Sequence, residues 1–313
     1  MYSYIRQNAM INDFIRLGPV ALKTLTPTHG RAVIKRDKFS VEIANFSKLI
    51  SININAGLKT SAYRLFDAIV LYFTEHNCGH EVFLNLEDYM KLCVQSDIKE
   101  ARRKINDDLK MLGALTISYA EKKRSYNIKF FETAAIKNSI ITVTLDSNFS
   151  EIMGKSYIMP FPCAMFSIKA DKNPNSYYIL RKIIEHKNMN FGKPNENTIS
   201  AKTLLEAAPL IPKVKDVRGT LNHSIYKRIF IPFYRDLRQA CEIINVDFSL
   251  SRKRDGNDIN CEELKGFLFE DFCSDVYIHL SQSWPEYPVR ETRRKRTRKW
   301  KTAAKKMEGE IQH

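Results

Sequence analysis

One order of predicted elements occurs twice in this 313-residue chain, and it restricts the folds that the chain can adopt. Residues 60–76 carry apolar side chains at helical spacing, and the short extended run VFLNL and a second helix, LEDYMKLCV, follow them. A third helix is expected between Ser96, its predicted N-cap, and Gly113, its predicted C-cap. Two strand-like runs, ALTISYAEKK and SYNIKFFET, then flank a basic turn, and a third strand, SIITVTL, comes after them.

The second copy begins with SYYILRKIIEHKN, residues 176–188, although its letters match those of residues 61–77 only weakly. Asn173 as N-cap and Pro174 as first helical residue predict where this helix starts. A short helix capped by Ser200 follows, and then a turn rich in Pro and Gly leads to a long helix over 222–243. The runs VDFSL and VYIHLSQ supply two strands, with the basic turn SRKRDGND after the first of them.

A winged helix, which is a helix-turn-helix with a hairpin wing, has this order of elements: a helix, a short strand, two helices and a β-hairpin. The sequence therefore predicts an α+β fold with two tandem winged-helix domains, over 60–158 and 159–289. Residues 1–59 are poorly patterned apart from a hairpin expected in AVIKRDKFSVEIANF, and YIMPFP is expected to be a loop or connector. Residues 290–313 form a basic tail that is expected to be disordered or helical.

The third helix of the first copy has three faces when its residues are placed about 100° apart. The apolar stripe consists of Ile98, Ala101, Ile105, Leu109 and Leu112. The basic face consists of Lys99, Arg102, Arg103, Asn106 and Lys110, and the acidic face of Asp97, Glu100, Asp107 and Asp108. A cationic face suits phosphate contacts, and Arg and Asn read guanine and adenine in the major groove. The alternative is a solvated helix whose opposite charges pair along its surface.

The long helix of the second copy is divided in the same way. Its apolar side consists of Ile229, Phe233, Leu237, Ala240 and Ile244, and its basic side of Ser224, Lys227, Arg228, Arg235 and Arg238. Pro232 predicts a bend that separates the two pairs of cations, which makes Lys227 and Arg228 the better candidates for reading bases. The predicted wing tips are basic as well and suit phosphates: Lys122, Lys123 and Arg124 in the first copy, and Arg252, Lys253 and Arg254 in the second.

The charge of the chain points to a polyanionic partner. The net charge is +15, of which residues 290–313, with ten basic and three acidic side chains, supply +7 and the rest of the chain +8. A surface of this kind suits nucleic acid, and the tail, with Trp300, is expected to add non-specific affinity. The alternative is a solvated surface that has no partner. No apolar run approaches the length of a membrane span and no signal peptide is visible, so a cytoplasmic protein is expected.

The sequence offers no catalytic or metal-binding pattern. MGKSY at 153–157 lacks the first glycine of a phosphate-binding loop, because Phe149 stands at that position. His76 and His80 do not have the spacing of a rolling-circle nickase, and Tyr178 is more simply a packing residue than a nucleophile. None of the six cysteines forms a C-x-x-C pair, so free thiols are expected. We therefore predict a DNA-binding protein without enzymatic activity, cofactor or metal.

Two stretches carry a resemblance to a known family. YKRIFIPFYRDLRQACEI and MPFPCAMFSIKADKNPNSYYILRKIIEHKNMN resemble the last long helix and the domain junction of plasmid replication initiators with two winged-helix domains, the Rep_3-like class. The resemblance covers roughly residues 30–285 at the expected domain sizes. It implies binding to direct repeats (iterons) of double-stranded origin DNA, opening of AT-rich DNA, and recruitment of the host initiator and helicase machinery. It also implies a homodimer through the first domain that represses the initiator's own gene.

A transcriptional repressor built from tandem winged helices is the strongest alternative, because the same elements would serve it. Direct repeats beside an AT-rich tract near the gene would favour the initiator, whereas a single palindrome at a promoter would favour the repressor.

Overall fold

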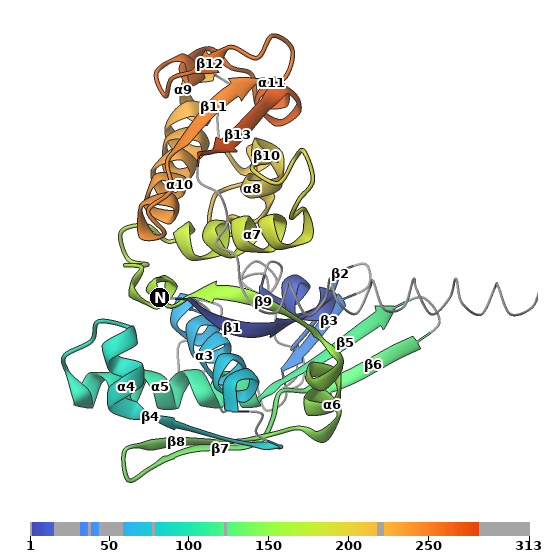
Figure 1. Cartoon of the computed structure of the whole chain (residues 1–313), viewed down its shortest axis with the longest axis vertical. Helices are drawn as coiled ribbons and strands as arrows, with labels where there is room; N and C mark the ends of the chain where they lie inside the picture. The colour runs from blue at the N-terminus through green and yellow to red at the C-terminus, as the bar shows by residue number, and fades with distance from the viewer. Residues whose placement is uncertain are drawn as a thin grey trace, which may run out of the picture. The chain divides into compact units, whose positions relative to one another are not determined.

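The computed structural model describes residues 2–15, 32–36, 39–43, 59–76, 79–121, 124–217 and 222–281 (Figure 1). The predicted basic tail, residues 290–313, and the turn residues Lys122 and Lys123 lie outside these ranges. The fold mixes helices and strands. A helix over 9–15 lies in the first half, together with β1 (Tyr2–Gln7), β2 (Ala32–Arg36), β3 (Phe39–Ile43), α3 (Thr60–His76), β4 (Glu81–Asn85), α4 (Leu86–Leu92), α5 (Ile98–Gly113), β5 (Leu115–Glu121), β6 (Arg124–Lys129), β7 (Phe131–Lys137), β8 (Ile140–Leu145), α6 (Ser147–Lys155) and β9 (Tyr157–Pro162).

The second half repeats much of this order. Its elements are η3 (Cys163–Ser167), α7 (Ser176–Met189), β10 (Thr198–Ser200), α8 (Ala201–Glu206), η4 (Val214–Asp216), α9 (Asn222–Ile225), η5 (Tyr226–Phe230), α10 (Ile231–Ile243), β11 (Phe248–Arg252), β12 (Asp258–Ile259), η6 (Glu263–Gly266), α11 (Phe269–Asp275) and β13 (Val276–Leu280). The predicted helix over 60–76 is confirmed as α3, and the predicted short helix after Ser200 as α8.

Each half contains an antiparallel sheet with the same strand order. In the first half β4, the strand after the first helix, pairs with β8, and β8 pairs with β7. In the second half β10 pairs with β13, and β13 pairs with β11. In both sheets the last strand lies beside the strand that follows the first helix, and its other neighbour is a strand from after the long helix, β7 in the first half and β11 in the second. The repeat that is weak in the letters of the sequence is clear in the topology.

The strands that were predicted to form the first wing are the wrong ones. The hairpin around residues 122–123 exists as β5 and β6, but it joins β3 and β2 in a separate four-stranded sheet. The strands that complete the sheet of β4 are β7 and β8, which are connected through Asn138 and Ser139. Both of these residues have positive φ angles, 47° and 61°, as a tight two-residue hairpin turn requires. The turn Asn138–Ser139 lies beside α5, where Arg102 bonds to Ser139.

The N-terminal segment is more ordered than its sequence pattern suggests. β1 pairs antiparallel with β9, from Tyr2 opposite Pro162 to Gln7 opposite Tyr157. The run YIMPFP is thus a strand and not a loop, and the predicted boundary between residues 158 and 159 falls inside it. β1 packs on α3 (Figure 1). The following helix inserts Phe14 among Phe66 and Phe130, with ring centroids 5.4 and 4.7 Å away.

A buried cluster of polar side chains joins α3 to α7. The Asp67 carboxylate, fully buried, accepts hydrogen bonds from the Tyr177 hydroxyl and from the Arg181 guanidinium. Burial raises the pKa of Asp67, although Arg181 and Tyr177 both act to lower it. The remaining carboxylate oxygen of Asp67 and the Nε and Nη2 atoms of Arg181 are buried and have no hydrogen-bond partner among the described residues. The two halves are thus linked through a charged pair that has little access to water.

The helix starts show where local sequence signals compete. Asp97, and not the predicted Ser96, caps α5, because its carboxylate accepts hydrogen bonds from the backbone N–H groups of Lys99 and Glu100 at 2.9 and 3.0 Å. Helix α7 starts at Ser176, after Asn175, two residues later than Asn173 and Pro174 suggest. Ser200 is confirmed as the cap of α8, since its hydroxyl accepts a hydrogen bond from the Thr203 N–H.

Candidate nucleic-acid interface

Helix α5 exposes a row of cations, but carboxylates on the same helix pair with some of them. Lys99, Arg102, Arg103 and Lys110 are exposed as predicted, and Asn106 is half-buried. Arg103 forms ion pairs with Glu100 at 2.8 Å and with Asp107 at 3.4 Å. Lys104, which was not among the predicted residues, pairs with Glu100 at 3.3 Å. The paired helix surface that was the alternative interpretation is therefore present on one side of α5.

Two residues of α5 depart from the predicted faces. Asp108 belongs to the predicted acidic surface but is 8% exposed, because it packs against the first turn of α3 and accepts a hydrogen bond from the Ser61 hydroxyl. Burial raises the pKa of Asp108 to about 7. Ile98 belongs to the predicted apolar stripe but is 43% exposed, since it is the first residue of the helix. The other four stripe residues are buried as predicted: Ala101, Ile105, Leu109 and Leu112.

The β7–β8 turn lies beside the cationic side of α5. The Arg102 guanidinium donates a hydrogen bond to the Ser139 hydroxyl at 3.4 Å, and the Leu86 N–H at the start of α4 donates to the Ser139 carbonyl at 2.9 Å. Lys137, exposed at the end of β7, adds a cation that was not predicted from the sequence. The predicted wing-tip residues Lys122 and Lys123 lie outside the described residues. The Arg124 backbone opens β6, and its side chain is not described.

The long helix of the second half changes its hydrogen-bond register just before Pro232. Residues Tyr226–Phe230 form a π-helical turn, in which the Ile231 N–H donates to the Tyr226 carbonyl, five residues earlier. Pro232 then stands in the first turn of α10, where a proline, which has no N–H to donate, is well tolerated. The sequence predicts a bend at Pro232, and the structure has a π turn directly before this residue.

The two sides of this helix agree with the sequence-based prediction. The apolar side is buried: Ile229, Phe233, Leu237, Ala240 and Ile244. Lys227, Arg228, Arg235 and Arg238 are exposed, and Ser224 is half-buried. One residue was missed: Ile231, 39% exposed, stands among these cations. The helical period gives its position on this face, but a single apolar residue among cations is too common in sequences to indicate a site.

The exposed cations of this helix differ in how tightly they are held. Arg235 bonds to Asp236 at 2.9 Å, and Arg238 lies over the Tyr234 ring, 5.0 Å from its centroid. The side chains of Lys227 and Arg228 form no hydrogen bond or ion pair with any other described residue. Asp236 is fully buried, and its other carboxylate oxygen accepts two hydrogen bonds from Asn175 at the start of α7. The cations at the start of the long helix are thus the ones most available to a ligand.

The predicted second wing turn is held in place by α11. Arg252 ends β11 and stacks on Phe267, with the guanidinium carbon 4.9 Å from the ring centroid. The backbone N–H of Lys253 donates to the Asp275 carbonyl at 2.6 Å, and that of Arg254 donates to the Asp275 carboxylate at 3.0 Å. The side chains of Lys253 and Arg254 are exposed. A basic turn with a fixed backbone is available to phosphates beside the long helix.

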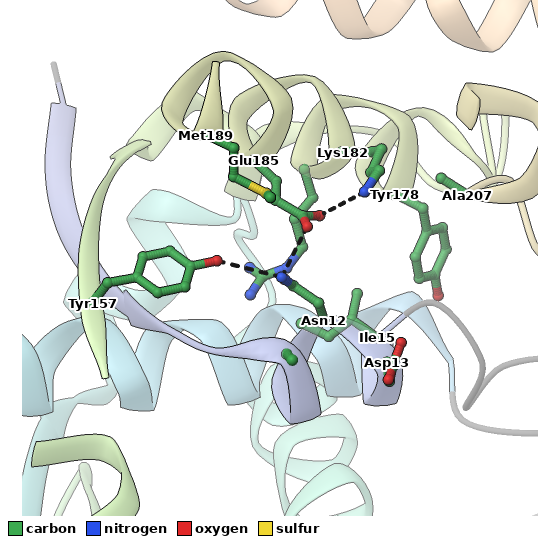
Figure 2. Close-up of a pocket in the computed structure, with 11 residues that line it drawn as sticks. Asn12, Asp13, Ile15, Tyr157, Tyr178, Lys182, Glu185, Met189 and Ala207 are labelled. Carbon is green, nitrogen blue, oxygen red and sulfur yellow. Dashed lines mark hydrogen bonds and ion pairs between the residues drawn. The ribbon is translucent and has the colours of Figure 1, made fainter. Parts of the chain in front are cut away.

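A cavity of about 370 Å³ lies between the helix over 9–15 and α7 (Figure 2). Its polar side chains bind one another: the Asn12 amide donates to Glu185 at 3.0 Å and to the Tyr157 hydroxyl at 3.4 Å, and Lys182 pairs with Glu185 at 3.1 Å. Figure 2 shows these groups converging from the two helices and β9. We interpret the cavity as part of the junction that fixes the N-terminal segment to α7.

The described residues contain no group of three or more His, Cys, Asp or Glu side chains placed to hold a metal ion. Among them, Cys93, Cys163, Cys241, Cys261 and Cys273 are free thiols. Within the same ranges, no helix has the length and apolar character needed to cross a membrane.

Comparisons with known proteins give a distant structural likeness. No protein-family model matches the chain, and no curated protein matches it. The chain is similar to a crystal structure of selenomethionine derivatives of domains 2 and 3 of RctB, at a TM-score of 0.44 and 9% identity, over 88% of this chain and 100% of that one. A second crystal structure, of RctB domains 2–3, has a TM-score of 0.44 and 10% identity, over 86% of this chain and 96% of that one.

Proposed function

We propose that the chain is a sequence-specific double-stranded DNA-binding protein that initiates replication at an origin. The observation that carries the proposal is the exposed face of the long helix in the second half, where Lys227, Arg228, Arg235 and Arg238 lie opposite a fully buried side. Cations confined to one helix face suit the phosphates and base edges of a major groove. A fixed basic turn, Arg252–Arg254, accompanies the same helix.

Each half is proposed to be a winged helix. In the first half α4 and α5 form the helix-turn-helix and β7–β8 the wing. In the second half α8 and the long helix play these parts, with β11 and β13 as the wing. The shared sheet order of the two halves supports this assignment, because the strand after the first helix borders the final strand in both.

The two long helices are proposed to act differently on DNA. On α5, Arg103 already has two carboxylate partners, so we assign Lys99, Arg102, Arg103, Asn106 and Lys110 mainly to phosphate contacts. On the long helix of the second half, Arg228 is exposed and unpaired among the described residues, and a forked guanidinium can bind guanine with two hydrogen bonds. Lys227 and Ser224 would support it, and Arg235 and Arg238 would contact the backbone.

The replication role comes from the resemblance to plasmid initiators. It adds direct repeats as the binding site, an AT-rich tract opened by binding energy, the host initiator and helicase as partners, and a homodimer through the first half. The proposed protein acts in the cytoplasm and needs neither cofactor nor catalytic residue. Transcriptional regulation by the same DNA-binding surfaces is the second candidate, favoured by the same exposed cations.

Binding selection tests DNA recognition directly. The full chain should enrich a defined duplex from a random library, and Arg228→Ala should weaken binding to that duplex by about 1–3 kcal/mol and relax the choice of one base pair. Arg103→Ala, which removes an exposed cation that is already paired on α5, is the matched control and should cost less and leave base choice intact. A library without enrichment, or an unchanged affinity of Arg228→Ala, would refute the assignment.

Replication itself needs a cell-based test. A plasmid without an origin, carrying the gene and its flanking DNA, should be maintained in a suitable host if the chain is an initiator. Loss of the plasmid in every host, together with tight binding at a promoter, would favour the regulator.

A further inference from the structure

Ile231 is an apolar residue in the middle of a cationic surface. It is 39% exposed and opens α10 directly after the π turn. Single exposed apolar residues are ordinary on protein surfaces, so the exposure alone carries no meaning. The neighbours of Ile231 distinguish it: residues three and four positions away on a helix lie near each other, and three of these four positions hold cations, Lys227, Arg228 and Arg235, while Tyr234 stands at the fourth.

The angular position of Ile231 places it within the row of exposed cations formed by Lys227, Arg228, Arg235 and Arg238, which we call the cationic strip. On a regular helix Arg238, Ile231 and Arg235 fall within about 60° of arc, with Ile231 between the two arginines. All three side chains are exposed, and none of them belongs to the buried side that packs against the rest of the second half. Glu242, an exposed acidic residue on this face, lies at its C-terminal end, about three turns from Ile231 and one turn from Arg238.

A ligand that covers this strip has to offer negative charge on both sides of a small apolar group. The major groove of DNA has this arrangement, with two phosphate rows on either side of base edges whose apolar group is the C5-methyl of thymine. RNA lacks that methyl group on uracil, and the deep, narrow major groove of its helices does not admit such a helix face.

Resting on the proposed DNA-binding function, we infer that Ile231 contacts a thymine methyl group and is a specificity-determining residue. Arg228 and Lys227 then reach the base pairs on one side of that thymine, while Arg235 and Arg238 hold the backbone on the other. The contact selects an A·T pair at one position of the site, which hydrogen-bonding side chains alone would not require. Ile231 acts by shape and exclusion of water and takes part in no chemical step.

Replacement of single thymines by deoxyuridine tests this contact, because it removes only the methyl group. The probe is the duplex that the full chain selects from a random library, with each thymine replaced in turn. Burial of one methyl group corresponds to about a fourfold change in affinity, so the wild-type chain should lose about fourfold at one or two positions. Ile231→Ala should bind the unmodified duplex more weakly by a similar factor and should be indifferent to deoxyuridine at those positions.

Two further variants make the result specific. Ile231→Val keeps most of the apolar surface and should retain the sensitivity to deoxyuridine. Met189→Ala removes another exposed apolar side chain, 60% exposed at the end of α7, and should behave like the wild type at every position. Because Ile231 is exposed, the alanine variant should keep the wild-type circular dichroism spectrum and melting temperature within a few degrees.

The outcomes separate this inference from the function on which it rests. If the duplex binds tightly and Arg228→Ala weakens it, but no deoxyuridine position matters or Ile231→Ala keeps the wild-type sensitivity, the thymine contact is refuted while DNA recognition stands. If the chain selects no duplex, both are refuted, and an acidic protein becomes the ligand to seek for this strip.

Discussion

Asp108 should make the stability of the chain depend on pH, and Asp108→Asn should remove that dependence. The carboxyl lies on α5 with 8% of its surface exposed, against the first turn of α3. Burial raises its pKa from an ordinary value of 3.8 to about 7, and the Ser61 hydroxyl, which donates a hydrogen bond to it, offsets only part of this effect. The folded protein therefore holds a proton on Asp108 at a pH where the unfolded chain has released it.

The sign and size follow from this difference. Below the ordinary pKa of the carboxyl, Asp108 is protonated in both the folded and the unfolded state and does not reduce the free energy of unfolding. As pH rises toward about 7, unfolding releases a proton, so the free energy of unfolding falls by about 1.4 kcal/mol per pH unit. Above the folded pKa both states are ionised, and the loss levels off at about 4 kcal/mol. Between about pH 5 and about pH 8 the change attributable to this carboxyl is about 3 kcal/mol.

Urea unfolding followed by far-UV circular dichroism measures how much Asp108 changes the free energy of unfolding between these pH values. The wild type should lose about 3 kcal/mol more than Asp108→Asn between the two pH values, at an unchanged slope against urea. Asp88→Asn is the control, because Asp88 is an exposed carboxylate that pairs at the surface with Lys91; this variant should keep the wild-type dependence. Parallel curves for the wild type and Asp108→Asn would refute the argument, as would a carbon NMR titration that places the Asp108 midpoint near the ordinary value.

Three other perturbations test separate parts of the molecule. Arg181→Met should destabilise the fold by about 3–5 kcal/mol because it leaves Asp67 charged and buried, and the double variant with Asp67→Leu should recover most of that loss in thermal unfolding. Asp97→Ala should cost about 1 kcal/mol by removing the cap of α5, whereas Ser96→Ala should leave urea stability within about 0.5 kcal/mol of the wild type. Deletion of residues 290–313 should make the slope of log binding constant against log salt concentration less steep, by about 0.9 for each phosphate contact that is lost. An unchanged slope would assign the tail another role.

Helices were predictable here because their signal is local. The buried and exposed sides of the long helix in the second half, from Ile229 to Ile244, follow directly from a 3.6-residue period. Pro232 predicts a bend, since proline cannot donate the bond that an uninterrupted helix needs, and the structure has a π turn directly before it. The cap of α5 was placed one residue early because Ser96 and Asp97 are both good caps, and the geometry of the preceding turn decides between them.

Strand pairing was not predictable to the same degree, because it depends on segments far apart in the chain. β6 ends at Lys129 and β7 begins at Phe131, so two successive hairpins compete for the edge of β4. Nothing in their alternation shows that β5 pairs with β3 instead, and β3 comes from the poorly patterned N-terminal segment. β9 met the same difficulty: its partner, β1, lies at the other end of the first half, and a run with two prolines suggests a loop.

A count of cations along the sequence overestimates how many of them are available to a ligand on α5 and underestimates the long helix of the second half. On the sequence α5 has more cations than the long helix of the second half, yet Glu100 and Asp107 remain at its surface and pair with Arg103. On the second helix Asp236 bonds to its neighbour Arg235, but it is fully buried and its other oxygen is held by Asn175.

This difference determines what an incoming phosphate meets on each helix. A phosphate approaching Arg103 or Lys104 on α5 has to compete with carboxylates that are already in place. A phosphate approaching Lys227 or Arg228 on the second helix meets no such competitor among the described residues. Lys227 and Arg228, whose side chains are exposed and have no partner among the described residues, are therefore the cations that we propose to read DNA.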